Sequence, residues 1–105
     1  MSQFDVHRNT GRSASEIPYV VIVQSAAFDK RKRRVVVPLV AVGNVKPPHS
    51  GVNPVFTIKG SKVVLHPFDM VSVSVGSLGE LVGSLTDEGD TIIAALDELF
   101  SRAWG

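Results

Sequence analysis

Short runs of β-branched residues constrain the fold of this chain more than any other feature of the sequence. Residues 19–25, "YVVIVQS", and residues 34–42, "RVVVPLVAV", are apolar without alternation, which is typical of strands that are buried or covered on both faces. Pro38 lies inside the second run. Because proline cannot donate to a sheet ladder, it predicts an edge position or a bulge there.

Three more segments have strand patterns. Residues 3–8, "QFDVHR", alternate apolar and polar side chains, as half-buried strands do. Residues 54–67, "PVFTIKGSKVVLHP", place two β-rich runs around Lys59-Gly60-Ser61, which predicts a hairpin with glycine in its turn. Residues 68–76, "FDMVSVSVG", predict a strand with one apolar face and one face of small polar side chains.

Three stretches rich in turn-forming residues separate these runs. Residues 9–16, "NTGRSASE", and residues 43–53, "GNVKPPHSGVN", predict loops by composition. Residues 75–85, "VGSLGELVGSL", are glycine-rich but lack the lysine and the strand-to-helix context of a phosphate-binding loop. We interpret this third stretch as turns.

The last segment changes to a helical period. In residues 86–105, "TDEGDTIIAALDELFSRAWG", one apolar stripe is formed by Ile92, Leu96, Leu99, Phe100 and Ala103. Thr86 is the expected N-cap, with acidic residues at 87, 88 and 90 near the positive end of the helix. The sequence therefore predicts a mainly β fold, mostly antiparallel, that ends in a C-terminal α-helix.

Length and composition limit the possible classes of protein. A chain of 105 residues forms one domain, 1–105, and at this size a second copy would help to bury apolar surface, so we expect a homodimer. The sequence has no cysteine and no long apolar run, so we expect a cytoplasmic location and no membrane contact.

Charge is divided along the chain. Residues 1–68 hold ten Lys/Arg against three Asp/Glu, and residues 69–105 hold one against seven, so the two parts carry about +7 and −6. This division can offer a basic surface to an acidic partner, whereas a simple nucleic-acid footprint is not indicated.

Few residues predict catalytic or metal chemistry. The histidines His7, His49 and His66 are far apart in the sequence, so no metal site is indicated, and we expect no cofactor. Asp29 and Asp69 are isolated carboxylates near predicted strand ends. Without a second titrating group in sight, a turn or capping role is favoured over acid–base catalysis.

Two features remain open on the residues alone. The run "DKRKRR", residues 29–34, is either a solvated loop that protects a strand edge or a phosphate contact. Trp104 is either the last packed member of the helical stripe or a side chain held out for a partner, because the chain ends one residue later.

The order of several motifs resembles the CcdB family of bacterial toxins. The likeness rests on "QFDV", on "VQS" followed by "RRVVVPL", on "PVFTI", on "DMVSV" and on a C-terminal helix that ends in aromatic residues. The resemblance implies a small SH3-like β-barrel or sheet of the type shared by CcdB and MazF. It also implies a two-fold homodimer, a CcdA-like antitoxin as partner, and operator DNA bound only through the antitoxin complex, which represses its own operon.

The resemblance further implies a non-enzymatic inhibitor that traps DNA gyrase on cleaved DNA by inserting between the arms of the gyrase A subunit. The residues that correspond to the gyrase-contacting surface of the family are Trp104, Gly105, Phe100, Phe28, Ala27 and Asp97. Here "SRA" separates Phe100 from Trp104, where the family has them adjacent, and no isoleucine follows Gly105. In a helix this insertion turns Trp104 by roughly −60° and advances it about 4.5 Å.

Charge suggests where the antitoxin binds, and the altered ending leaves alternatives. A disordered acidic tail should seek the basic part of the chain, with Arg8, Arg12, Arg31 and Arg33 as the expected contacts. The alternatives to gyrase poisoning are a MazF-like endoribonuclease that uses the basic run, and a divergent CcdB-like protein whose target is altered or lost, including one kept only to bind antitoxin.

Overall fold

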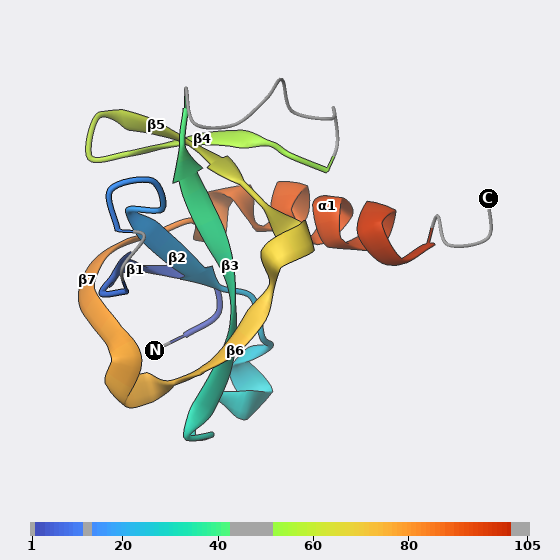
Figure 1. Ribbon diagram of the computed structural model, residues 1–105. Helices are drawn as coiled ribbons and strands as arrows, with labels where there is room; N and C mark the ends of the chain where they lie inside the picture. Colours follow the sequence, from blue (N-terminus) through green and yellow to red (C-terminus); the bar gives the residue numbers. More distant parts are fainter. Residues whose placement is uncertain (1, 12–13, 43–51, 102–105) are drawn as a thin grey trace.

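The computed structural model describes residues 2–11, 14–42 and 52–101 (Figure 1). Within these residues the chain forms seven strands and one α-helix, with short 3-10 turns between several of them. The elements are β1 (Asp5–Asn9), β2 (Tyr19–Ile22), β3 (Arg33–Ala41), β4 (Val55–Ile58), β5 (Ser61–Leu65), β6 (Val71–Ser74), β7 (Leu78–Ser84) and α1 (Gly89–Ser101). The strands form one curled antiparallel sheet in the order β4-β5-β3-β2-β1-β7, and β6 also pairs with β3. The predicted fold class is confirmed.

The central strand, β3, has different partners along its length. It pairs with β2 on one side, while on the other side β6 pairs with residues 33–36 and β5 with residues 39–41 (Figure 1). Pro38 lies where this partner changes.

This change of partner explains how a central strand tolerates proline. The Pro38 carbonyl accepts a hydrogen bond from the His66 N–H at 3.0 Å, whereas the His66 carbonyl accepts one from the Asp69 N–H at 3.2 Å. In an antiparallel ladder the N–H and the carbonyl of a residue face the same neighbouring strand. An N–H at residue 38 would therefore face the His66 carbonyl, which already accepts from Asp69. The N–H that Pro38 lacks thus leaves no acceptor unsatisfied. The expectation of an edge or a bulge at Pro38 is wrong.

The core lies between one face of the sheet and α1. Val37 and Leu39 of β3 are fully buried in one apolar cluster with Ile92 and Ala95 of α1. Because neighbouring residues in a strand point to opposite faces, Val36 and Pro38 lie on the face of the sheet that α1 does not cover.

The helix starts later than predicted and its stripe is narrower. Thr86–Glu88 form a 3-10 turn, and the Thr86 hydroxyl shares a 2.6 Å hydrogen bond with Ser84. The predicted Thr86 N-cap is therefore wrong, because Leu85 still donates to the carbonyl of Phe4, at 2.8 Å, and keeps the preceding residues in the sheet.

The apolar stripe of α1 is confirmed at Ile92 and Leu96, which pack on the sheet, but Phe100 is 61% exposed. Ala103 lies outside the described residues. None of the helices in the described part of the chain is long and apolar enough to span a membrane.

The segment that we interpreted as turns contains a strand. Val75–Ser77 is a 3-10 turn, but Leu78–Ser84 is β7, which pairs with β1 through an irregular register. Pairing with β1 stabilises extended backbone in β7 despite its two glycines, Gly79 and Gly83, so tertiary context outweighs local composition.

The other strand predictions are confirmed by β1, β2, β3, β6 and the β4–β5 hairpin. Ile58 pairs with Ser61 across Lys59 and Gly60, which have φ values of 50° and 82°. Positive φ at both residues is typical of the type I′ turn that joins twisted strands. The predicted loop at residues 9–16 joins β1 to β2 where it is described, and residues 43–51 of the other predicted loop lie outside the described residues.

Candidate functional site

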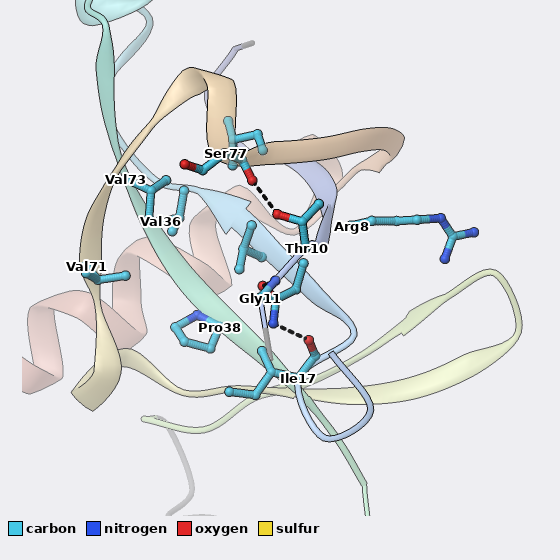
Figure 2. Close-up of a pocket in the computed structure, with 12 residues that line it drawn as sticks. Arg8, Thr10, Gly11, Ile17, Val36, Pro38, Val71, Val73 and Ser77 are labelled. Carbon is cyan, nitrogen blue, oxygen red and sulfur yellow. Dashed lines mark hydrogen bonds between the residues drawn. The ribbon is translucent and has the colours of Figure 1, made fainter. Parts of the chain in front are cut away.

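The face of the sheet opposite α1 carries a hollow of about 480 Å³. We call it the apolar hollow. Its floor is lined by residues from β2, β3 and β6, namely Val20, Val36, Pro38, Val71 and Val73, of which Figure 2 labels the last four. Valines on β6 alternate with serines, so the apolar face predicted for residues 68–76 lines an open surface rather than the core.

Polar residues of the β1–β2 connection form the rim of the apolar hollow. The Thr10 hydroxyl donates to the Ser77 carbonyl at 2.7 Å, and the Asn9 side chain donates to the Ile17 carbonyl at 2.8 Å (Figure 2). The first bond ties the start of the loop to the turn before β7, and the second joins the two ends of the loop to each other. The rim is therefore held in place by its own polar groups.

Arg8 extends outwards at the rim of the apolar hollow (Figure 2). Its Nε lies 2.9 Å from Oε1 of Glu80 on β7, and its guanidinium lies 5.9 Å from the centre of the Tyr19 ring. The hydrogen bond from Arg8, reinforced by its charge, lowers the pKa of Glu80, and the same bond raises the pKa of Arg8. Both side chains are about half exposed or more, so the pair is weak and can exchange partners.

A second hollow, of about 700 Å³, is lined by four cationic side chains from the chain segment that leads into β3. We call it the basic hollow. Its lining consists of Gln24, Phe28, Lys30, Arg31, Lys32, Arg33 and Ser72. Arg33 is held there by hydrogen bonds from Nε to the Ser72 hydroxyl, at 3.2 Å, and from Nη2 to the Ser72 carbonyl, at 2.7 Å.

The basic run is only partly the loop that one of our interpretations expected. Arg33 and Arg34 belong to β3, and Arg34 is fully buried. The Arg34 guanidinium donates to Oε1 of Gln24, at 2.8 Å, and to Oδ1 of Asp29, at 3.1 Å. Arg34 thus clamps the two ends of the Ala26–Phe28 turn, and Asp29 has the turn role that its isolation in the sequence favoured.

The two hollows lie on opposite faces of the β3–β6 ladder. Val35 pairs with Ser72, which places Ser72 and Arg33 on the face of β3 that α1 covers. Val36 pairs with Val71, and both line the apolar hollow on the other face. The structure therefore separates the expected antitoxin contacts, with Arg8 at the apolar hollow and Arg31 and Arg33 at the basic hollow.

The residues expected to contact gyrase are on the surface where they are described. Ala27 and Phe28 lie in a turn capped by Ser25, whose hydroxyl accepts from the Ala27 N–H at 3.2 Å. Phe28 is 46% exposed, and on α1 both Asp97 and Phe100 are exposed. Trp104 and Gly105, like the antitoxin candidate Arg12, lie outside the described residues.

The histidines do not assemble a site in the described residues. His7 is buried, and its Nδ1 donates to the Gly79 carbonyl at 2.9 Å, while His66 directly follows β5. His49 lies outside the described residues. Over the part of the chain that the structure describes, no three potential metal-ligating side chains lie together.

Sequence reasoning missed the apolar hollow and the clamp by Arg34. Pro38, Val36 and Arg34 share one face of β3 through simple alternation, and that signal was present in the run "RVVVPL". The alternation alone does not predict a hollow, because the sequence does not show that α1 covers only the opposite face of β3.

Comparison with known proteins agrees with this architecture. A family model described as "CcdB protein" matches residues 3–101. No curated protein sequence matches the chain.

Two solved structures share the fold. A mycobacterial endoribonuclease in complex with its cognate antitoxin superposes with a TM-score of 0.78 at 15% identity, covering 100% of this chain and 99% of that chain. A second mycobacterial endoribonuclease gives 0.75 at 15% identity, covering 100% and 95%. At this identity the likeness supports the fold alone. The family match spans nearly the whole chain, and the chain therefore belongs to the CcdB family of toxins from toxin–antitoxin systems.

Proposed function

We propose that this CcdB-family protein is a non-enzymatic toxin that binds DNA gyrase and traps the cleaved gyrase–DNA complex. The observation that carries the proposal is the family match over residues 3–101. In mechanism, the toxin contributes binding energy rather than bond chemistry.

The proposed gyrase surface combines the Ala26–Phe28 turn with the end of the chain. Phe28 and Phe100 are 46% and 61% exposed, and exposed aromatic side chains are the kind that dominate protein interfaces. The Arg34 clamp holds the turn rigid before binding, which lowers the entropic cost of association. Trp104 and Gly105 are proposed to complete this surface.

We also propose that an antitoxin segment occupies the apolar hollow. One of the similar solved structures is a toxin bound to its cognate antitoxin. The valine floor suits the apolar side of an amphipathic segment, and Arg8 at the rim suits a carboxylate. An incoming carboxylate would replace Glu80 as the partner of Arg8, an exchange between exposed groups of similar strength.

The test of gyrase poisoning is a DNA cleavage assay with gyrase of the host, supercoiled plasmid and ATP. The native chain should accumulate linear DNA with covalently attached protein, and Trp104→Ala should abolish that product. The matched control is Phe68→Ala, because Phe68 is an aromatic residue whose exposure, 59%, is close to the 61% of Phe100, and it lies outside the proposed surface. If Phe68→Ala and Trp104→Ala have equal effects, the role of the chain ending is refuted.

The same preparation tests the alternative activity. Metal-independent cleavage of single-stranded RNA, lost on substitution of Arg31 and Arg33, would replace the gyrase proposal with a MazF-like endoribonuclease. Tight antitoxin binding with neither activity would identify a divergent chain that only sequesters antitoxin.

A further inference from the structure

The basic hollow concentrates positive charge in a concave site. The gyrase proposal shares only Phe28 with it, the antitoxin proposal uses none of its residues, and only the alternative of RNA cleavage uses its Arg31 and Arg33. Lys30, Arg31, Lys32 and Arg33 all line it. In a strand, four consecutive side chains would alternate between faces, whereas here residues 30–32 precede β3. The bend before the strand is what brings all four charges to one hollow.

Local hydrogen bonds hold this segment in shape. The Phe28 and Asp29 N–H groups donate back to the carbonyls of Ser25 and Ala26 at 3.0 and 3.1 Å, and the Arg31 N–H donates to Phe28 at 3.0 Å. Arg34 anchors the same segment from beneath, through Gln24 and Asp29. The cations are thus presented by an ordered turn.

The charge of the hollow is not neutralised by its own lining. Among the residues that the structure describes, no acidic side chain lines the hollow. Asp29, the acidic residue next in sequence, accepts from the buried Arg34 instead. Although the net charge of the chain is only +1, four cationic side chains line this hollow, so the local potential there is positive.

Phe28 adds a flat apolar surface to this positive site. It lines the hollow and is 46% exposed. Cationic side chains that follow a phosphate backbone, combined with an aromatic ring on which a base can stack, are the features that bind single-stranded nucleic acid without sequence preference. An acidic peptide would use the cations but would leave the ring without a stacking partner.

We propose that the basic hollow binds a short single strand of nucleic acid, with its phosphates on Lys30–Arg33 and one base stacked on Phe28. The chemistry is shared by DNA and RNA. Binding alone is proposed, so no acid–base pair is needed, and the site operates whether or not gyrase is the target.

The test is fluorescence anisotropy of the full-length protein with labelled oligothymidine and oligouridine of about 12 nucleotides, within the range of known single-strand sites. Affinity should fall with salt, with a slope of log K against log salt near −2.8 if four phosphates are contacted, since each contact contributes about −0.7. Arg31→Gln and Lys32→Gln should each flatten the slope by about 0.7.

Two further variants separate stacking from charge. Phe28→Leu should weaken binding roughly tenfold and leave the salt slope unchanged. Lys62→Gln is the matched control, because Lys62 is an exposed lysine on β5, near the opposite end of β3, and it should change neither affinity nor slope. Circular dichroism melts of all variants verify that the fold is retained.

Several outcomes would overturn the proposal. An abasic oligonucleotide or an acidic peptide that binds as tightly as oligothymidine would show a general polyanion surface or a peptide site. Equal losses in Lys62→Gln and Arg31→Gln would show that the charge effect is not local to the hollow. If oligothymidine and oligouridine bind with different affinities, the tighter one identifies the natural strand as DNA or RNA. Both results support the proposal that the hollow binds single-stranded nucleic acid. The gyrase assay uses a different readout and a different variant, so the two proposals can fail separately.

Discussion

Gly79 is the residue at which one side chain atom would disturb the rim of the apolar hollow. A Cβ there would lie 2.7 Å from the Arg8 carbonyl oxygen and 3.0 Å from Cγ2 of Thr10. We expect Gly79→Ala to lower the free energy of unfolding by about 1–3 kcal/mol, because the backbone of β1 must shift. Urea denaturation measures this change.

Gly83 provides the control on the same strand. A Cβ at Gly83 would meet nothing within 4 Å, so Gly83→Ala should change stability by less than about 0.5 kcal/mol. Similar losses in both variants would mean that glycine is needed throughout β7 for its flexibility rather than at residue 79 for its close contact with β1.

The pair of Arg8 and Glu80 tests the proposed antitoxin site at a single contact. Arg8→Gln should weaken binding of an acidic antitoxin segment, whereas Glu80→Gln should strengthen it, because the competitor for Arg8 is removed. Isothermal titration at two salt concentrations measures both. Weakening by both variants would show that Glu80 itself contacts the antitoxin.

The same pair has a defined pH dependence. Because Arg8 lowers the pKa of Glu80 through a hydrogen bond and its charge, the pair stabilises the fold above the ordinary pKa of glutamate. That contribution is lost as pH falls through the lowered pKa. Glu80→Gln should therefore slightly flatten the acid side of the stability curve.

At the scale of elements, the turn before β3 depends on a residue inside the strand. Arg34→Met removes the guanidinium that joins Gln24 to Asp29. We expect a loss of roughly 2–3 kcal/mol, somewhat below that for breaking a fully buried ion pair, because the Asp29 side chain is 33% exposed. Hydrogen exchange should rise at residues 26–31 more than elsewhere.

Arg33→Gln is the matched control for this clamp. Arg33 is the adjacent arginine, is exposed and bonds to Ser72 instead, so its substitution should leave exchange in the turn unchanged. Uniform exchange changes across the molecule in Arg34→Met would show a global rather than a local role.

At the scale of the whole molecule, much apolar surface is left uncovered in one copy. Large apolar side chains that are at least 39% exposed include Phe28, Val55, Phe68, Val71, Leu81, Ile93 and Phe100. Exposed aromatic side chains are enriched at protein interfaces, and a small chain gains most from burying such surface against a second copy, so we expect the protein to form a homodimer. Sedimentation equilibrium over a range of concentrations should give twice the mass of the chain, and a monomer at all concentrations would contradict this expectation.

Patterns that depend on neighbours in the chain were read correctly from the sequence. The β-branched runs and the alternation of apolar and polar side chains predicted six strands, β1 to β6, and Lys59-Gly60 predicted a hairpin, because the side-chain period and the backbone freedom of glycine act locally. The helical stripe was read for the same reason. The predicted start of the helix was less accurate. Thr86 was expected to cap it, but the hydrogen bond from the Leu85 N–H to the Phe4 carbonyl keeps the preceding residues in the sheet, and the helix begins at Gly89.

Properties that depend on residues far apart in the chain were decided only by the tertiary structure. Pro38 is accommodated because β6 and β5 divide the side of β3 between them, and Leu78–Ser84 is extended because β1 pairs with it. The sequence by itself determined the family and the class of fold. Contacts between distant segments decide which face of the sheet α1 covers, and no local pattern encodes them. That choice in turn decides which side chains form the apolar hollow, the buried clamp and the basic hollow.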